Sequence, residues 1–148
     1  MKKLSLLLVA AVPLLFTGCD IHEHYETYEV VGSELFVDYI DVNGSDWQLY
    51  GVEGQPGCYV YQEFRFDEIN QKVLNGGAVL VYLVDADNRD NILPYVFPVD
   101  NGHELIMQNI RYEVELGILT IVIEWQDFKK YIQDNYKFKV CILTPGKK

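Results

Sequence analysis

Apolar and polar residues alternate with a period of two over much of the chain, a pattern typical of strands with one buried and one wet face. The clearest run spans 106–115, where mostly apolar side chains take the even positions and charged or amide side chains the odd ones. The phase changes at Gly117, which predicts a tight hairpin or bend. Two strands follow, with the inward residues Leu119, Ile121, Ile123, Trp125, and then Tyr136, Phe138, Val140, Ile142. Cys141 therefore points outward.

Earlier strands are expected at 28–31, 35–42, 47–50, 59–66, 78–84 and 95–99. Asn43-Gly44 and Asn101-Gly102 indicate turns. Residues 78–84 are apolar on both faces, which predicts a central strand covered on each side. The segment Asp67–Asn75 predicts a short crossover helix capped by Asp67, and a second helical turn is expected to start at Asp127.

Seven or eight short strands with regular turn signals predict an all-β fold, an antiparallel β-sandwich of immunoglobulin-like shape with one short crossover helix. A small closed β-barrel is the alternative. No Gly-, Pro- or Ser-rich linker divides the chain, so we expect one domain over residues 29–148. Trp47 and Trp125 are expected in its core.

The first 18 residues have the features of an export signal. Lys2 and Lys3 are basic, residues 4–16 are apolar, and Thr17-Gly18 are small. Cys19 follows directly, and the segment resembles a lipobox, with Phe16 at the position where Leu is usual. We therefore expect a signal peptide at 1–18, acylation of Cys19 with two or three chains, and a polar tether over 19–28 that reaches at most ~30 Å.

The chain is acidic. Its formal net charge is −10, and loss of residues 1–18, which include Lys2 and Lys3, makes it −12. Phosphate backbones and anionic lipids attract clustered Lys and Arg, so we expect no nucleic-acid partner and membrane contact only through the lipid.

Cys58 and Cys141 remain once Cys19 carries lipid. An even pair in an exported chain allows a disulfide, but two cysteines do not form a dense framework, and two free thiols are the preferred interpretation. A cysteine nucleophile is less favoured, because no His lies in a recognisable partner context.

Two segments have metal-binding side chains. His22-Glu23-His24 with Glu26 contains Zn or Cu ligands, but a flexible leash is favoured. The stretch 85–91 (DADNRDN) begins like a Ca²⁺ loop, then has Arg89 at the fifth position and Asp90 instead of Gly at the sixth. A solvated hairpin loop is the preferred interpretation, and we expect no metal and no cofactor.

Tyr59 and Tyr61 share one face of their strand with Glu63 and Arg65. Aromatic rings beside polar groups suit sugar binding, because a ring packs on C–H patches while polar neighbours bond hydroxyls. We therefore name Tyr59 and Tyr61 as candidate ligand-binding residues, against the simpler interpretation that Tyr is common in strands. Carboxylates are plentiful, but no His, Ser or Cys constellation pairs with them, so we expect no enzyme.

Five segments together resemble a family of small Bacteroidota lipoproteins of unknown function. They are Asp46-Trp47, Gly77-Ala78-Val79, Leu93-Pro94-Tyr95-Val96, Gly117-Ile118-Leu119-Thr120-Ile121 and Asp127-Phe128, and the likeness runs from about Val30 to Thr144. The resemblance implies a β-sandwich on a lipid anchor in the cell envelope and provides no catalytic residues.

We expect a lipoprotein of the cell envelope that acts as a surface binding module for a glycan or a protein. The alternative is a structural or assembly subunit of an envelope complex. Asp20 resembles an inner-membrane retention signal, whereas Glu23 and Glu26 resemble a surface-export signal. The family resemblance favours the outer membrane, with exposure at its outer face.

We predict that Cys19→Ala blocks acylation. In a bacterium that processes lipoproteins, the natural chain should incorporate labelled palmitate and sediment with membranes, whereas the variant should do neither. Cys58→Ala is the control and should behave as the natural chain does. Membrane association that persists without Cys19 would contradict the lipid anchor.

Overall fold

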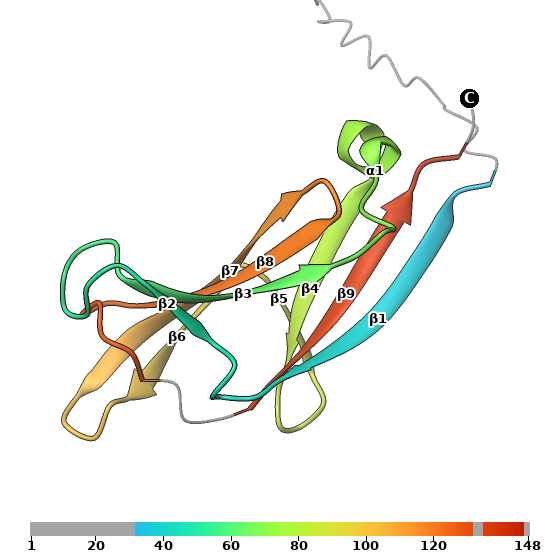
Figure 1. Cartoon of the computed structure of the whole chain (residues 1–148). Coiled ribbons are helices and arrows are strands. Elements are labelled where there is room, and N and C mark those ends of the chain that lie inside the picture. Colours follow the sequence, from blue (N-terminus) through green and yellow to red (C-terminus); the bar gives the residue numbers. More distant parts are fainter. Residues whose placement is uncertain (1–31, 132–134, 147–148) are drawn as a thin grey trace, which may run out of the picture.

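The computed structural model describes residues 32–131 and 135–146, which form a β-sandwich with one short helix (Figure 1). All strand pairs are antiparallel, and neither sheet closes on itself. The predicted sandwich is confirmed and the barrel alternative is wrong. The expected strand at 28–31 lies outside the described residues.

Sheet A has the strand order β1-β9-β4-β5, and sheet B has the order β2-β3-β8-β7-β6. Sheet A contains β1 (Glu34–Val42), β9 (Tyr136–Thr144), β4 (Ala78–Val84) and β5 (Asp90–Ile92). Sheet B contains β2 (Gln48–Tyr50), β3 (Tyr59–Arg65), β8 (Ile118–Trp125), β7 (Leu105–Glu115) and β6 (Tyr95–Asp100). The helix α1 (Gln71–Gly76) joins β3 to β4 and so leads the chain from sheet B to sheet A (Figure 1).

The core lies between the two sheets. Inward residues of β8 and β9 are completely buried: Leu119, Ile121, Ile123, Phe138, Val140 and Ile142. Trp47 and Trp125 are also buried, as predicted. Each such apolar side chain contributes about 2 kcal/mol through burial, so this dry contact is the main source of stability.

Two hydrogen bonds also connect the layers. The Tyr112 hydroxyl of β7 donates to the carbonyl of Val79 in β4 at 2.8 Å. Gln108, which is 3% exposed, donates from Nε2 to the Tyr136 hydroxyl of β9 at 3.0 Å. These bonds satisfy polar groups that face the core, where an unpaired group would cost about 1–3 kcal/mol.

The hairpin predicted at Gly117 is confirmed. Glu115 and Ile118 are register partners, and Gly117 has a φ of 74°, a conformation that glycine adopts without strain. The Gly117 N–H donates to the carbonyl of Ile69 at 2.8 Å, and its carbonyl accepts from the N–H of Phe66 at 3.1 Å. The turn therefore also holds the segment that leads into α1.

The helix starts later than the sequence predicts. Its N-cap is Asn70, whose Oδ1 accepts from the N–H groups of Lys72 and Val73 at 2.9 and 3.3 Å. Asp67 is not the cap, because Ile69 is buried in the core with its N–H bonded to Phe66, which keeps 67–70 in a turn.

The helical turn expected from Asp127 is replaced by a single turn closed by the Phe128 N–H on the Trp125 carbonyl. Phe128 has a φ of 59°, which is incompatible with continuing a right-handed helix. Tyr131 still packs inward, edge-on to Trp125 at 6.1 Å.

The strand β4 is central in its sheet, as predicted, but only one of its faces is covered. Val81 and Leu83 are buried in the core, whereas Leu80 on the other face is 39% exposed. The short strand β5, which the sequence analysis assigned to a loop, pairs with the end of β4.

We predict that Gly77→Ala destabilises the sandwich. A Cβ at Gly77 would lie 2.2 Å from the Leu143 carbonyl oxygen and 2.8 Å from Val73 Cα, and backbone atoms cannot move aside cheaply. We expect a loss of about 2 kcal/mol or more in the free energy of unfolding, measured by denaturant titration.

Gly76→Ala is the matched control. A Cβ there would meet only a Pro145 ring carbon at 4.0 Å, and alanine is the better helix former, so stability should stay level or rise by up to ~1 kcal/mol. Equal stability of the two variants would contradict the close approach at Gly77.

Candidate functional site

Three tyrosine rings meet on the outer face of sheet B. Tyr59 and Tyr61 are two positions apart on β3, so they point to the same side. Tyr50 of the edge strand β2 is the register partner of Tyr59, and their rings stack with centroids 4.7 Å apart and planes at 18°. Tyr61 lies edge-on to Tyr59 at 6.3 Å. We call these three residues the tyrosine cluster.

Polar groups border the tyrosine cluster. The Tyr61 hydroxyl donates to Gln48 Oε1 at 3.1 Å, which leaves the Gln48 amide N–H groups to other acceptors. Arg111 of β7 places its guanidinium carbon 5.8 Å from the Tyr59 ring centroid and forms an ion pair with Glu113. Donors and acceptors thus lie on both sides of the rings.

The face is also closely packed. Val122 of β8 lies between Tyr61 and Arg111 in the register, and it is only 2% exposed although it points away from the core. The two longer side chains flank it and shield it from water. The outer face of sheet B is therefore an ordered surface at this point, which lowers the entropy cost of binding.

Burial raises the pKa of Tyr59, and the nearby Tyr50 and Glu113 add to this effect while Arg111 opposes it. Its hydroxyl stays protonated at neutral pH, so it can both donate and accept a hydrogen bond.

Tyr59 and Tyr61, the two predicted site residues, lie side by side. Tyr50, Gln48 and Arg111 were not among the predicted site residues. Gln48 and Tyr50 lie two positions apart in an expected strand, which indicates that they share a face. The pairing of that strand with β3 cannot be predicted from the alternation. Arg111 and Tyr59 lie on strands with β8 between them, so their contact depends on the strand order of sheet B.

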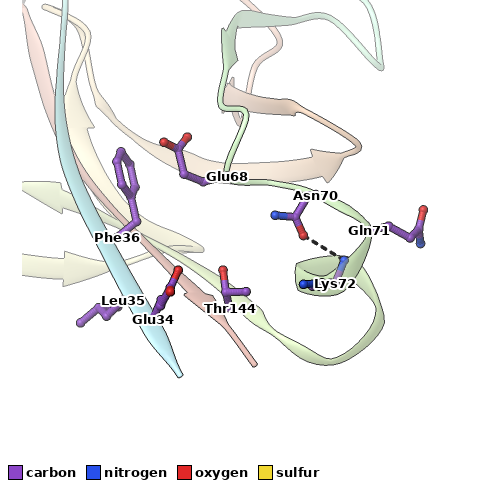
Figure 2. A pocket seen from close by; sticks show the side chains of 8 residues that line it. All are labelled: Glu34, Leu35, Phe36, Glu68, Asn70, Gln71, Lys72 and Thr144. Atoms are coloured by element: carbon purple, nitrogen blue, oxygen red, sulfur yellow. Dashed lines mark hydrogen bonds between the residues drawn. The ribbon is translucent and has the colours of Figure 1, made fainter. Parts of the chain in front are cut away.

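A hollow of about 640 Å³ lies at the other end of the molecule, between the start of β1, the end of β9 and α1. Figure 2 shows its lining residues: Glu34, Leu35, Phe36, Glu68, Asn70, Gln71, Lys72 and Thr144. The Asn70 amide oxygen is directed at the Lys72 backbone as the helix cap (Figure 2). The lining contains no His, Cys or Ser, and it forms no nucleophile–base pair.

A second hollow of about 440 Å³ lies at the end of the sandwich opposite α1 and is lined partly by Gln108, Tyr131 and Tyr136. Its polar side chains bond one another. The Tyr131 hydroxyl donates to Asp127 Oδ2 at 2.6 Å, which raises the pKa of Tyr131, and Gln108 bonds Tyr136. The Gln108–Tyr136 bond joins β7 to β9 at this end of the sandwich.

Residues 85–89 connect the β4–β5 hairpin, and Asp90 and Asn91 begin β5. Asp85 accepts from the backbone N–H groups of Asp87 and Arg89 at 3.0 and 2.9 Å, and the Arg89 guanidinium pairs with Asp85 and Asp87. Arg89 thus places its positive charge against both carboxylates. Within residues 32–131 and 135–146, no group of three or more His, Cys, Asp or Glu side chains is arranged to hold a metal ion.

Cys58 and Cys141 are free thiols. Cys58 is buried beside the start of β3 in sheet B, whereas Cys141 points outward from sheet A, so the disulfide is not formed. Burial raises the pKa of the Cys58 thiol, and Glu53 adds to this, which makes it unreactive. Cys19 and His22-Glu23-His24 lie outside the described residues.

No helix in the described part of the chain is long and apolar enough to cross a membrane. No protein-family model, curated protein or solved structure matches the chain. The tyrosine cluster with its polar border is the strongest candidate site.

We predict that Asp85→Asn destabilises the protein at neutral pH but not in acid. The hydrogen bond from the Arg89 backbone, with the Arg89 and Asn91 side chains, lowers the pKa of Asp85. Because this pKa is lower in the folded than in the unfolded chain, ionised Asp85 stabilises the fold at pH values above the ordinary carboxyl pKa of about 3.9. This contribution is lost as the pH falls through the folded pKa. The urea midpoint of the variant should be lower at pH 7, and the difference from the natural chain should disappear as the pH falls below the folded pKa of Asp85.

Asp87→Asn is the control, since Asp87 pairs with Arg89 only through exposed side chains and should change the midpoint little. Addition of Ca²⁺ should not shift the midpoint of the natural chain. A clear Ca²⁺-dependent rise would show that cations displace Arg89.

Proposed function

We propose that this chain is a non-enzymatic binding module of the cell envelope, anchored by lipid at Cys19 to the outer membrane with its domain at the outer surface. We further propose that the tyrosine cluster binds a carbohydrate. The observation that carries the proposal is the Tyr50–Tyr59 stack with Tyr61 at its edge, on an outer face otherwise rich in polar groups.

The chemistry of the face suits a sugar better than an apolar ligand. Aromatic rings pack against the C–H groups of a pyranose, while Gln48 and Tyr59 supply hydrogen bonds to hydroxyls. The net charge of −10 disfavours polyanionic glycans, and Glu113 already neutralises Arg111. Neutral polysaccharides are therefore the expected class.

The position of the cluster fits a ligand that approaches from solution. The hollow that contains Glu34 also contains Gln71 and Lys72, so the start of β1 and α1 lie at the same end of the sandwich. Tyr59 begins β3, and Arg65 at its other end leads toward α1. The cluster is therefore about 20 Å, the length of β3, from the end where the tether enters.

An assembly subunit is the second candidate, and a different observation favours it. The outer face of sheet A exposes several large apolar side chains, among them Leu35 and Val37 of β1. Such a face is typical of a protein contact. The two roles are compatible, because they use opposite faces of the sandwich.

We expect Tyr59→Ala and Tyr50→Ala to weaken glycan binding at least about tenfold, a loss of ~1.4 kcal/mol, because each removes half of the ring stack. The chain from Asp20 to Lys148, which contains every described residue, is incubated with neutral host and dietary polysaccharides, and retention is measured by affinity electrophoresis. Tyr61→Phe keeps the ring and should cost less.

Tyr39→Ala is the matched control. Tyr39 is an exposed strand tyrosine on sheet A, so its loss should leave retention unchanged. Equal losses in Tyr39→Ala and Tyr59→Ala would contradict a site on sheet B. Release of reducing ends would overturn the non-enzymatic assignment, and retention of no polysaccharide would favour the assembly role.

A further inference from the structure

The outer face of sheet A has an apolar half and a charge-balanced half. Outward residues that are register partners on neighbouring strands form rows across the face. The two rows nearest the start of β1 contain only apolar residues: Leu35–Leu143–Ala78 and Val37–Cys141–Leu80. The next two rows are Tyr39–Lys139–Tyr82–Ile92 and Asp41–Lys137–Val84–Asp90. Six large apolar residues on this face are between 39% and 65% exposed: Leu35, Val37, Tyr39, Leu80, Ile92 and Leu143. Tyr82 and Val84 are half-buried.

This composition is unusual for a sheet face that meets water. The outer face of sheet B is more polar, with Glu63, Arg65, Asn109, Arg111, Glu113 and Glu115 at outward positions, and its exposed apolar residues Val96, Leu105 and Met107 lie toward the β6 edge. Strand β4 instead reads AVLVYLV, as a strand covered on both faces does. Within the described residues no strand or helix packs across its outer side. The sequence of β4 is thus typical of a strand with a cover that residues 32–131 and 135–146 do not supply.

The charged half carries its own counter-charges. Lys139 forms an ion pair with Asp90 and lies 4.5 Å from the centroid of the Tyr82 ring. Lys137 lies 5.2 Å from the Tyr39 ring centroid, next to Asp41 across the register. The face is close to neutral, whereas the whole chain is strongly acidic, so two copies can approach through this face without repulsion from it.

The longer edge of sheet A is less suited to a partner than its face. β1 is one of the two edge strands, β5 being the other, and the Asp38 carboxylate accepts the N–H of Tyr39 at 2.8 Å, which removes one donor from the ladder that a strand added to β1 would need. A charge at an edge strand is a common device against strand addition.

We propose that the outer face of sheet A is covered by the same face of a second copy of this chain, forming a twofold dimer. At ~3.3 Å per residue and ~4.8 Å between strands, the sheet has a footprint of about 450 Å². Two copies would cover about 900 Å² of footprint, and somewhat more accessible surface because the face is corrugated. This is the lower end of the range for specific interfaces, so the dimer is weak in solution.

A twofold axis parallel to the strands makes the face self-complementary. When it runs along β9, it places β9 of one copy over β9 of the other, with β1 opposite β4, so that the apolar rows of the two copies cover each other. The starts of both β1 strands then lie at the same end of the dimer. Both tyrosine clusters face outward, so the dimer does not depend on carbohydrate binding and leaves it unobstructed.

The test is the mass of the chain from Asp20 to Lys148 as a function of concentration, measured by sedimentation equilibrium without carbohydrate. The mass should rise from one copy toward two between about 1 and 500 µM. Val37→Glu and Leu35→Glu should each weaken association at least about tenfold, because they place an uncompensated charge among the apolar rows.

Val96→Glu is the matched control. Val96 is an exposed valine on the edge strand β6 whose side chain points outward from sheet B, so its association should match the natural chain. Thermal unfolding confirms that each variant is folded, and Leu35, at 65% exposure, is the substitution least able to disturb the core. A chain that stays monomeric, or association weakened by Val96→Glu alone, would overturn the proposal.

A second measurement is independent of charge. Cys141 lies near the centre of the apolar rows, and in the dimer its sulfur is within about 10 Å of the second Cys141, the spacing of packed sheets. A bis-maleimide of that length should link two copies, and Cys141→Ser should abolish the link, because Cys58 is buried. Linkage only to other proteins would replace the second copy by a different partner and contradict the dimer.

Discussion

The apolar contact between the inner faces of β8 and β9 determines which residues point outward from both sheets. Leu119, Ile121 and Ile123 meet Phe138, Val140 and Ile142 between the sheets, and all six are fully buried. Because side chains alternate along a strand, a slip of one residue would move this whole set into water. Once this register is set, the outward faces of both sheets are determined, including the tyrosines of β3 and the apolar rows of sheet A.

The two outer faces then diverge in chemistry. On sheet B, polar residues surround three rings, so the aromatic surface is local and bordered by hydrogen-bonding groups. On sheet A, leucine and valine extend over two register rows and the charges are compensated within the face. A local aromatic patch suits a small polar ligand, whereas an extended, nearly neutral apolar face suits another protein surface. One sandwich thus presents two different kinds of contact.

The local pattern was sufficient for most strands, because alternation is a property of neighbours in the sequence. It placed the turn at Gly117 and the inward sets of the last three strands correctly. It failed where a contact between distant segments decides the outcome. Asn70 caps α1 instead of Asp67 because Ile69 is buried in the core, and Phe128 adopts a positive φ that ends a helical turn. The pairing of Tyr50 with Tyr59 and the contact of Arg111 with Tyr59 across β8 depend on a strand order that period-two alternation does not encode.

A lipid anchor would favour association through a weak interface. In solution, a contact at the lower end of the specific range competes with the full loss of translational and rotational freedom. Chains held by Cys19 in one membrane have already lost much of that freedom, so their effective concentration at the surface is higher than in bulk. A twofold axis parallel to the strands of sheet A keeps both tether ends on the membrane side, and the tyrosine clusters then lie about one strand length away. Two weak carbohydrate sites so presented would bind a repeating polysaccharide with an avidity that neither site has alone.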